Sequence, residues 1–195
     1  MKKRIALYCA CIILAGLWTW RYSTMNDYYD SFRNITEVRY QFGETVPFGT
    51  NKTSEGNVLD GYSICVKSLD VLETNAFLDT YGVTEDAFEI IPERIALVMI
   101  TLRNDGCDES VELTELALHG IDNYVGMNWT ALRELNPVLN GSTAIRLDHG
   151  TECNIVLPFN IFRQYFGSYT WNHMDEYSWF LRVTYWPERT DISVN

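Results

Sequence analysis

The sequence predicts a mainly β protein, an antiparallel β-sandwich with short helical insertions, preceded by one N-terminal transmembrane helix. Seven or eight short stretches alternate between apolar and polar residues, with turn residues closely spaced between them. No regular alternation of strands with long helices occurs, so a parallel sheet is not expected. A basic tip followed by an apolar run opens the chain, which is the layout of a membrane signal.

The stretch at residues 94–106 is the expected centre of the sheet. One face of an extended strand here would carry Ala96, Val98, Ile100 and Leu102, and the other Ile95, Leu97, Met99 and Thr101. A strand that is apolar on both faces is covered on both faces, which places it inside a sheet rather than at its edge. The turn residues Asn104, Asp105 and Gly106 end it.

The remaining elements follow from the same periodicities. Further strands are expected at residues 36–42, 62–72, 111–118, 124–128, 143–147, 153–157 and 176–186. Short helices are expected at residues 75–82, 84–88, 129–135 and 160–168. A bulge near Thr114 accounts for a slip in apolar phase, and residues 148–151 form a hairpin-like connection between the two strands beside them. Residues 43–60 are expected to be a long loop.

Residues 1–21 are predicted to be a cytoplasmic basic tip and a transmembrane signal-anchor. Lys2, Lys3 and Arg4 precede an apolar run at residues 5–20, which as a helix would span about 24 Å against a hydrocarbon core of about 30 Å. The basic tip orients the N-terminus to the cytoplasm. Two alternatives remain, which are cleavage near Ala15-Gly16 and a lipid anchor on a cysteine of the run.

This organisation divides the chain into four parts. The anchor is followed by a stalk at residues 22–35, a β-sandwich ectodomain at residues 36–188 and a polar tail at residues 189–195. The expected location is therefore the cell membrane, crossed once, with the C-terminal domain extracellular.

The net charge of the chain argues against nucleic acid as a partner. The formal net charge is −11, and three of the 15 basic residues lie at positions 2–4, so the predicted ectodomain is strongly acidic. A protein without a basic patch cannot release counterions from phosphates, and nucleic-acid binding is not expected.

No motif predicts an enzyme, a cofactor or a metal. His119, His149 and His173 show none of the spacings of a metal site, and no nucleophile elbow, phosphate loop or dinucleotide motif occurs. The acidic turn at residues 104–109 offers oxygen ligands for Ca²⁺ but lacks the spacing of an EF-hand loop. The three ectodomain cysteines, Cys65, Cys107 and Cys153, leave open a single disulfide with one free thiol.

The aromatic C-terminal third is the best candidate for binding. Part of it must face the core, because the last expected strand needs an inward face. Tyr169, Trp171 and His173 are instead expected in a loop, where they could form an exposed platform for a sugar ring or a peptide. Packing within the core is the alternative for these side chains.

Several segments together carry a family resemblance. The strand pattern at residues 96–106 resembles one in immunoglobulin-like domains of bacterial surface proteins. With Gly61-Tyr-Ser-Ile, Glu93-Arg-Ile-Ala-Leu-Val, Asn136-Pro-Val-Leu and Gly150-Thr-Glu-Cys-Asn-Ile-Val-Leu-Pro158, the chain resembles a family of uncharacterised, N-terminally membrane-anchored proteins of Gram-positive bacteria over roughly residues 40–187. The resemblance implies an immunoglobulin-like β-sandwich and no particular activity.

These observations support one leading hypothesis and two alternatives. The leading hypothesis is a non-enzymatic, membrane-anchored extracellular protein that binds a partner or interacts with the envelope. The first alternative is an enzyme or accessory acting on cell-wall glycan through the aromatic third and the nearby acids Asp175 and Glu176. The second is a structural subunit of a membrane complex.

Overall fold

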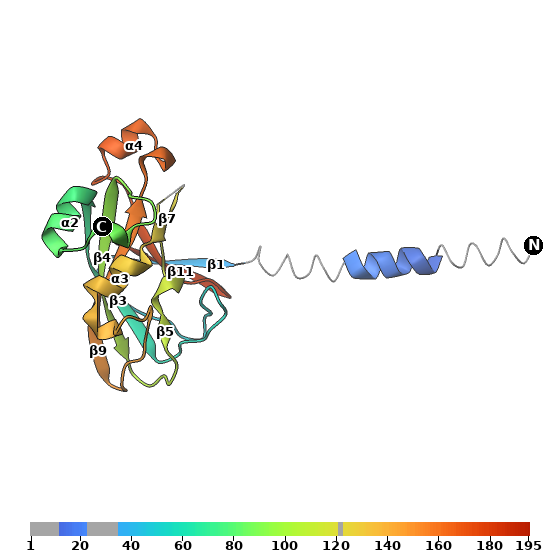
Figure 1. The fold of residues 1–195 in the computed structure, drawn as a ribbon. Helices are drawn as coiled ribbons and strands as arrows, with labels where there is room; N and C mark the ends of the chain where they lie inside the picture. Colours follow the sequence, from blue (N-terminus) through green and yellow to red (C-terminus); the bar gives the residue numbers. More distant parts are fainter. Residues whose placement is uncertain (1–11, 23–34, 121–122) are drawn as a thin grey trace, which may run out of the picture. The chain divides into compact units, whose positions relative to one another are not determined.

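The computed structural model describes residues 12–22, 35–120 and 123–195, in two compact units at residues 1–36 and 37–195 (Figure 1). Residues 12–22 of the first unit are helical. In the parts of the chain that the structure describes, no helix is long and apolar enough to cross a membrane. The expected span at residues 5–20 is described only from residue 12 onward. Most of the expected stalk, at residues 23–34, lies outside the described residues.

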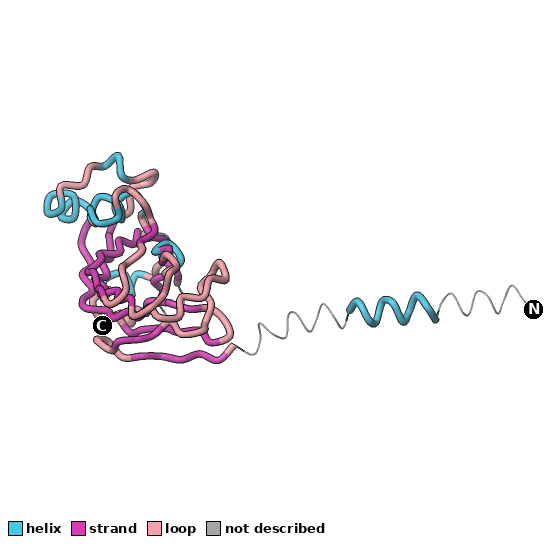
Figure 2. The backbone as a smooth tube through the Cα atoms, turned by 90° about the horizontal axis from the view of Figure 1, so that it is seen from below, coloured by secondary structure: helices cyan, strands magenta, loops and turns pink. Residues whose placement is uncertain are grey.

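The second unit is mainly β. Its strands are β1 (Thr36–Tyr40), β2 (Thr45–Pro47), β3 (Tyr62–Glu73), β4 (Arg94–Asn104), β5 (Val111–Glu112), β6 (Ala117–His119), β7 (Tyr124–Met127), β8 (Ala144–Ile145), β9 (Thr151–Ile161), β10 (Phe180–Thr184) and β11 (Glu188–Ser193). Its short α-helices are α2 (Thr74–Tyr81), α3 (Trp129–Leu135) and α4 (Ser168–Asn172). Single 3₁₀ turns are η1 (Glu85–Ala87), η2 (Leu113–Glu115), η3 (Pro137–Leu139) and η4 (Arg163–Tyr165). Figure 1 shows α2 and α4 toward one end of the strands, and Figure 2 distinguishes helices, strands and loops by colour.

Among the described residues, nine strands form one large, mostly antiparallel sheet in the order β1-β11-β10-β6-β7-β9-β4-β3-β2, and β5 pairs with β8 apart from it. The short strand β7 joins two halves of this sheet. It pairs with β6 through Val125 opposite Leu118, and with β9 through Gly126 opposite Asn160. One half therefore contains β1, β11, β10 and β6, and the other contains β9, β4, β3 and β2.

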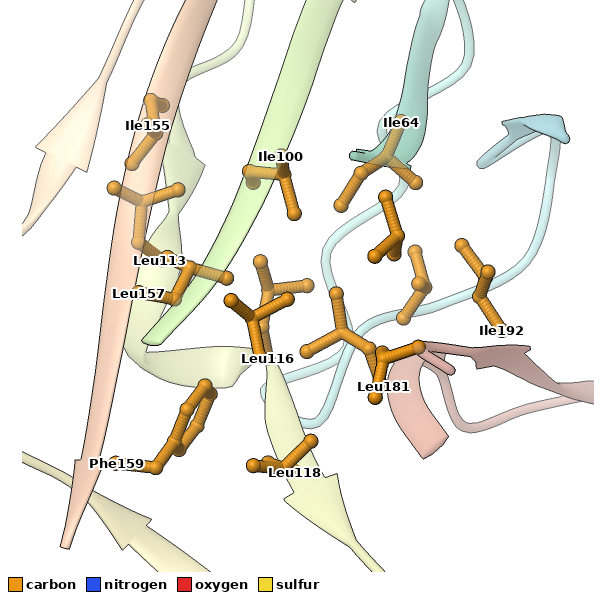
Figure 3. Packing of buried hydrophobic residues seen from close by; sticks show 14 of the residues in the cluster. Ile64, Ile100, Leu113, Leu116, Leu118, Ile155, Leu157, Phe159, Leu181 and Ile192 are labelled. Atoms are coloured by element: carbon orange, nitrogen blue, oxygen red, sulfur yellow. The ribbon is translucent and has the colours of Figure 1, made fainter. Parts of the chain in front are cut away.

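The two halves bury their apolar faces in one core (Figure 3). Leu118, Leu181 and Ile192 stand opposite one another across β6, β10 and β11, and all three are fully buried. From the other half, Ile100 and Ile155 are paired across β4 and β9. Burying a side chain of this size stabilises the fold by about 1.5–3 kcal/mol. The core therefore fixes which side of each strand faces inward.

A second, smaller core lies on the outer face of β4. There Ile95 and Leu97 pack with Phe77 of α2 and Ala131 of α3. Beyond this point the outer face is open, because Met99 is 39 % exposed and Arg103 is exposed. The interior position of β4, between β3 and β9, is confirmed. The prediction that both of its faces are covered is right for the first half of the strand and wrong for the second.

Several sequence predictions are confirmed. The strands expected at residues 62–72 and 124–128 correspond to β3 and β7, and the helices expected at 75–82 and 129–135 correspond to α2 and α3. Gly82 ends α2 with a φ of 68°, a left-handed conformation that glycine adopts without strain.

The predicted polar tail is wrong. Residues 188–193 form β11, which pairs with β10 from Thr190 to Ser193, and Thr190, Asp191 and Ile192 are buried. The segment looked like a tail because two of its buried residues are polar. Their partners lie across the pairing on β10: Thr184 donates a hydrogen bond to Thr190 Oγ1, and Arg182 donates to Asp191.

The predicted helix at residues 160–168 is also wrong. β9 continues to Ile161, because Ile155, Leu157, Phe159 and Ile161 form a period-two series that faces the core. Only the single turn η4 follows before α4.

The remaining differences concern short elements. The long loop at residues 43–60 contains β2, and the strand expected at 176–186 is the shorter β10. β8 pairs with β5 rather than with β9, so residues 148–151 do not close a hairpin. The phase slip near Thr114 is the 3₁₀ turn η2 rather than a bulge, because the Glu112 carboxylate accepts hydrogen bonds from the Thr114 backbone N–H and hydroxyl.

The half-covered outer face of β4 gives a stability prediction. Leu97→Ala is expected to lower the free energy of unfolding by about 2–5 kcal/mol, because it opens a cavity beneath α2 and α3. Met99→Ala, two residues along the same face, is expected to cost less than about 1 kcal/mol. Chemical denaturation of the two purified variants measures both values, and equal losses would contradict the boundary of the second core.

Candidate functional site

A hollow of about 560 Å³ lies on the outer face of the half-sheet that contains β10. Its lining residues are Glu37, Arg39, His119, Gly120, Tyr124, Ser178, Phe180, Arg182, Arg189 and Asp191. We call it the outer hollow. Strand alternation explains its composition, since Leu118 and Leu181 point into the core and their neighbours His119 and Arg182 point out.

The floor of the outer hollow is a buried ion pair. Arg182 and Asp191 face each other across β10 and β11, and both are buried. Arg182 Nε lies 2.8 Å from Asp191 Oδ1 and Nη2 lies 2.9 Å from Oδ2, which is the bidentate geometry of a strong guanidinium–carboxylate pair. Arg182 Nη1 donates to the hydroxyl of Tyr124. Every nitrogen of this guanidinium is therefore engaged.

The pair shifts the pKa of both partners. Burial favours the neutral form of Asp191, but hydrogen bonds from His119 and Arg182 and the charge of Arg182 outweigh it and lower the pKa from 3.8 to about 2. Burial likewise opposes the charge of Arg182, but Asp191 more than compensates and raises the pKa of the guanidinium. Both groups remain charged at neutral pH.

His119 completes the floor. Its ring stacks on Tyr124 at 5.1 Å between centroids and lies 5.7 Å from the Phe180 ring. His119 Nδ1 lies 2.9 Å from the Gly120 carbonyl. Nε2 lies 3.2 Å from both Asp191 Oδ2 and Arg182 Nη2. Both ring nitrogens thus have partners within the protein.

The rim of the outer hollow carries two more arginines. The Arg39 guanidinium lies 5.1 Å above the Phe180 ring, a cation–π arrangement. Arg189 Nη1 donates to Glu37 Oε1 at 2.7 Å, and Glu37 Oε2 lies 3.8 Å from Arg39 Nη2. The side chains of Arg39 and Glu37 are 60 % and 46 % exposed, so this rim is open to solvent.

The predicted platform of Tyr169, Trp171 and His173 is only partly assembled. Tyr169 is 73 % exposed, and its ring stacks on His173 at 4.3 Å with an interplanar angle of 19°. His173 Nδ1 also lies 2.9 Å from the Tyr169 carbonyl. These two residues form an aromatic pair on and just after α4, in which Tyr169 is exposed and His173 is half-buried.

Trp171 lies elsewhere. Its ring lies beneath two guanidinium groups, with Arg94 at 4.3 Å and Arg163 at 5.2 Å. Arg94 Nη1 also donates to the Trp171 carbonyl at 2.7 Å, and the side chain packs against the main core. Trp171 therefore has the packing role that was the alternative for it, while Tyr169 and His173 remain available at the surface.

The acidic turn after β4 uses its polar groups internally. The buried Asn104 amide donates to the Cys107 and Leu147 carbonyls and accepts from the Gly106 and Cys107 N–H groups. Asp105 pairs with Arg103 at 2.7 Å. Asn104 thus acts within the turn, and Asp105 pairs with a cation.

The structure pairs none of the three cysteines of the second unit. Cys65, Cys107 and Cys153 are free thiols. Burial raises the pKa of the Cys153 thiol, which favours its unreactive neutral form. Within residues 12–22, 35–120 and 123–195, no group of three or more histidine, cysteine or carboxylate side chains is placed to hold a metal ion.

Sequence reasoning missed the outer hollow, although two signals were present. Arg182 interrupts an apolar strand between Leu181 and Val183, and Asp191 precedes the apolar Ile192. A charged residue among core residues needs a buried partner of opposite charge. Which charges pair depends on the register of β10 and β11, and no spacing in the sequence reveals that register.

Comparison with known proteins identifies a family without identifying an activity. The family model described as a domain of unknown function, DUF5028, matches residues 37–190, which is most of the chain. The match covers nearly all of the second unit, residues 37–195, which we call the β-domain. No curated protein and no solved structure matches the chain.

The buried pair predicts how stability depends on pH. The folded-state pKa of Asp191, about 2, lies below its ordinary 3.8, so folding favours the carboxylate. The stabilisation is complete above about pH 4 and is lost as the pH falls towards about 2. It amounts to about 2 kcal/mol. Unfolding free energies measured across this range are expected to fall accordingly.

Asp191→Asn is the variant that isolates this contribution. It leaves the buried charge of Arg182 unpaired and is expected to cost about 3–5 kcal/mol at pH 7. Between about pH 4 and 2 it should then lose less stability than the natural chain. Asp108→Asn breaks only exposed contacts, with Arg146 and His149, and is the control, with an effect below about 1 kcal/mol. Parallel pH curves for the natural chain and Asp191→Asn would contradict the assignment.

Proposed function

The chain belongs to the DUF5028 family, and we propose that it is a non-enzymatic binding protein whose site is the outer hollow. The observation that carries this proposal is the open rim of Arg39 and Arg189. It lies above a floor whose charged groups, Arg182 and Asp191, already pair with each other. Concave sites with a few placed polar groups and aromatic walls are the usual form of ligand sites. The rim still presents hydrogen-bond donors and a ring face to a ligand.

The state of His119 favours binding over catalysis. A catalytic histidine orients one nitrogen with a carboxylate and presents the other to a nucleophile or substrate. In the outer hollow, Nε2 meets Asp191 and Arg182, and Nδ1 meets the Gly120 carbonyl. The ring therefore has no nitrogen left for proton transfer to a substrate.

We further propose that the β-domain is displayed outside the cell on a single-pass anchor. Support comes from the basic tip at residues 2–4 and the apolar run at residues 5–20. We also propose that the domain is an immunoglobulin-like sandwich of the kind found in Gram-positive surface proteins. Two antiparallel half-sheets that share one core, with Trp179 fully buried, support this.

The Tyr169–His173 pair favours a second candidate function, which is recognition of cell-wall glycan. Sugar rings stack on exposed aromatic faces, and Tyr169, at 73 %, is the most exposed large apolar side chain among the described residues of the β-domain. Under this alternative the outer hollow would be dispensable for binding. Substitutions of Arg39 in the outer hollow and of Tyr169 therefore distinguish the two candidate functions.

A binding experiment compares three variants of the full chain. Envelope material is incubated with the natural chain, Arg39→Ala, Arg146→Ala and Tyr169→Ala, and bound protein is measured by sedimentation. Arg39→Ala is expected to weaken binding about tenfold, because it removes charged hydrogen bonds from the rim. Arg146→Ala is the matched control, since the two arginine side chains are 60 % and 62 % exposed. Loss in Tyr169→Ala alone would favour the glycan candidate, and no saturable binding would refute both.

Topology has its own test. A reporter that is active only outside the cytoplasm, fused after Asn195, is expected to be active in cells that express the full chain. Replacing Lys2, Lys3 and Arg4 with neutral residues should reduce that activity, because these charges orient the anchor. A second reporter, active only in the cytoplasm, is fused at the same position. Activity of this reporter alone would contradict the proposed location.

A further inference from the structure

We propose that the rim of the outer hollow binds an oxyanion, a carboxylate or phosphate group, and that Glu37 competes with it for Arg39 and Arg189. This inference rests on the proposed function, because the same hollow is the binding site. It adds the chemical class of the ligand and a group in the chain that tunes its affinity.

The rim offers mainly donors. Arg39 and Arg189 are guanidinium groups, which only donate hydrogen bonds and whose fork geometry suits carboxylate and phosphate. The Tyr124 hydroxyl accepts from Arg182, so its own proton remains to be donated, and the side chain is 60 % exposed. A ligand that fits these three groups must be rich in acceptors.

A carboxylate of the chain itself already lies where the external oxyanion would bind. The Glu37 carboxylate lies between the two rim arginines, with Oε1 2.7 Å from Arg189 Nη1 and Oε2 3.8 Å from Arg39 Nη2. One oxyanion thus spans both cations. It does not saturate them, because Arg189 Nε is buried without a hydrogen-bond partner among the described residues.

The charges of the outer hollow favour an anion. Arg39, Arg182 and Arg189 outnumber Glu37 and Asp191 by one positive charge, in a chain whose net charge is −11. Arg182 and Asp191 neutralise each other in the floor, so the excess lies at the rim. The Phe180 ring beneath Arg39 holds that guanidinium in place.

Displacing Glu37 costs little. Its side chain is 46 % exposed, and exposed ion pairs contribute about 0–1 kcal/mol to stability. An external oxyanion needs only to exceed that small contribution, after which the freed Glu37 carboxylate is solvated. Removing the carboxylate altogether should therefore strengthen binding without unfolding the domain.

The experiment titrates the purified full chain with sodium phosphate and, separately, with sodium citrate, at an ionic strength held constant with sodium chloride. Calorimetry or the thermal midpoint reports binding. Glu37→Gln is expected to bind two- to fivefold more tightly, an estimate of about 1 kcal/mol or less for the lost competitor. Arg39→Gln and Arg189→Gln are expected to bind about tenfold more weakly. Arg146→Gln is the control and should match the natural chain.

The outcomes separate this inference from the proposed function. Preference for phosphate or for citrate identifies which oxyanion the rim selects. Equal binding by all variants, or binding no stronger than that of chloride, would overturn the inference. If envelope material still binds in an Arg39-dependent manner in that case, the proposed function stands and only the ligand class is wrong. If neither the salts nor the envelope material bind, both fail.

Discussion

The two half-sheets bury their inner faces against each other. This burial determines which side of each strand the remaining side chains occupy. Leu118, Leu181 and Ile192 face the core from three neighbouring strands. Because side chains alternate along a strand, burying these three forces His119 and Arg182 outward. The outer hollow is thus a consequence of the core, and a slip of one residue in register would destroy both.

The buried Arg182–Asp191 pair on the outer face also depends on the register of β10 and β11. β10 carries an irregularity between Arg182 and Thr184, so Arg182 stands opposite Asp191 but Thr184 stands opposite Thr190. A buried ion pair contributes little net stability against an apolar replacement, but an unpaired buried charge is costly. Any alignment that separates Arg182 from Asp191 is therefore penalised. We infer that the pair specifies how β11 aligns with β10 beyond what apolar packing specifies.

Sequence patterns predicted the elements whose buried residues are apolar and failed where buried residues are polar or elements are short. β3, β4 and α3 carry strong apolar periods, so their positions were predictable. β11 buries Thr190 and Asp191, and β2 has only three residues, so neither produces a period. The same limit applies to the site. Tyr169 is exposed as expected, but the cation–π contacts that hold Trp171 come from Arg94 and Arg163, which belong to other elements.

An oxyanion site in a strongly acidic chain constrains its ligand. At physiological ionic strength, charges further apart than about 8 Å are largely screened, so the rim arginines act on a ligand mainly at contact. The acidic surface repels a long polyanion over all the residues that it passes, whereas a single carboxylate or phosphate group meets only the rim. The arrangement therefore discriminates by charge density, because it admits one anionic group and disfavours a polymer of them. Glu37 sharpens this selection, since any ligand must first replace a carboxylate that the chain holds in place.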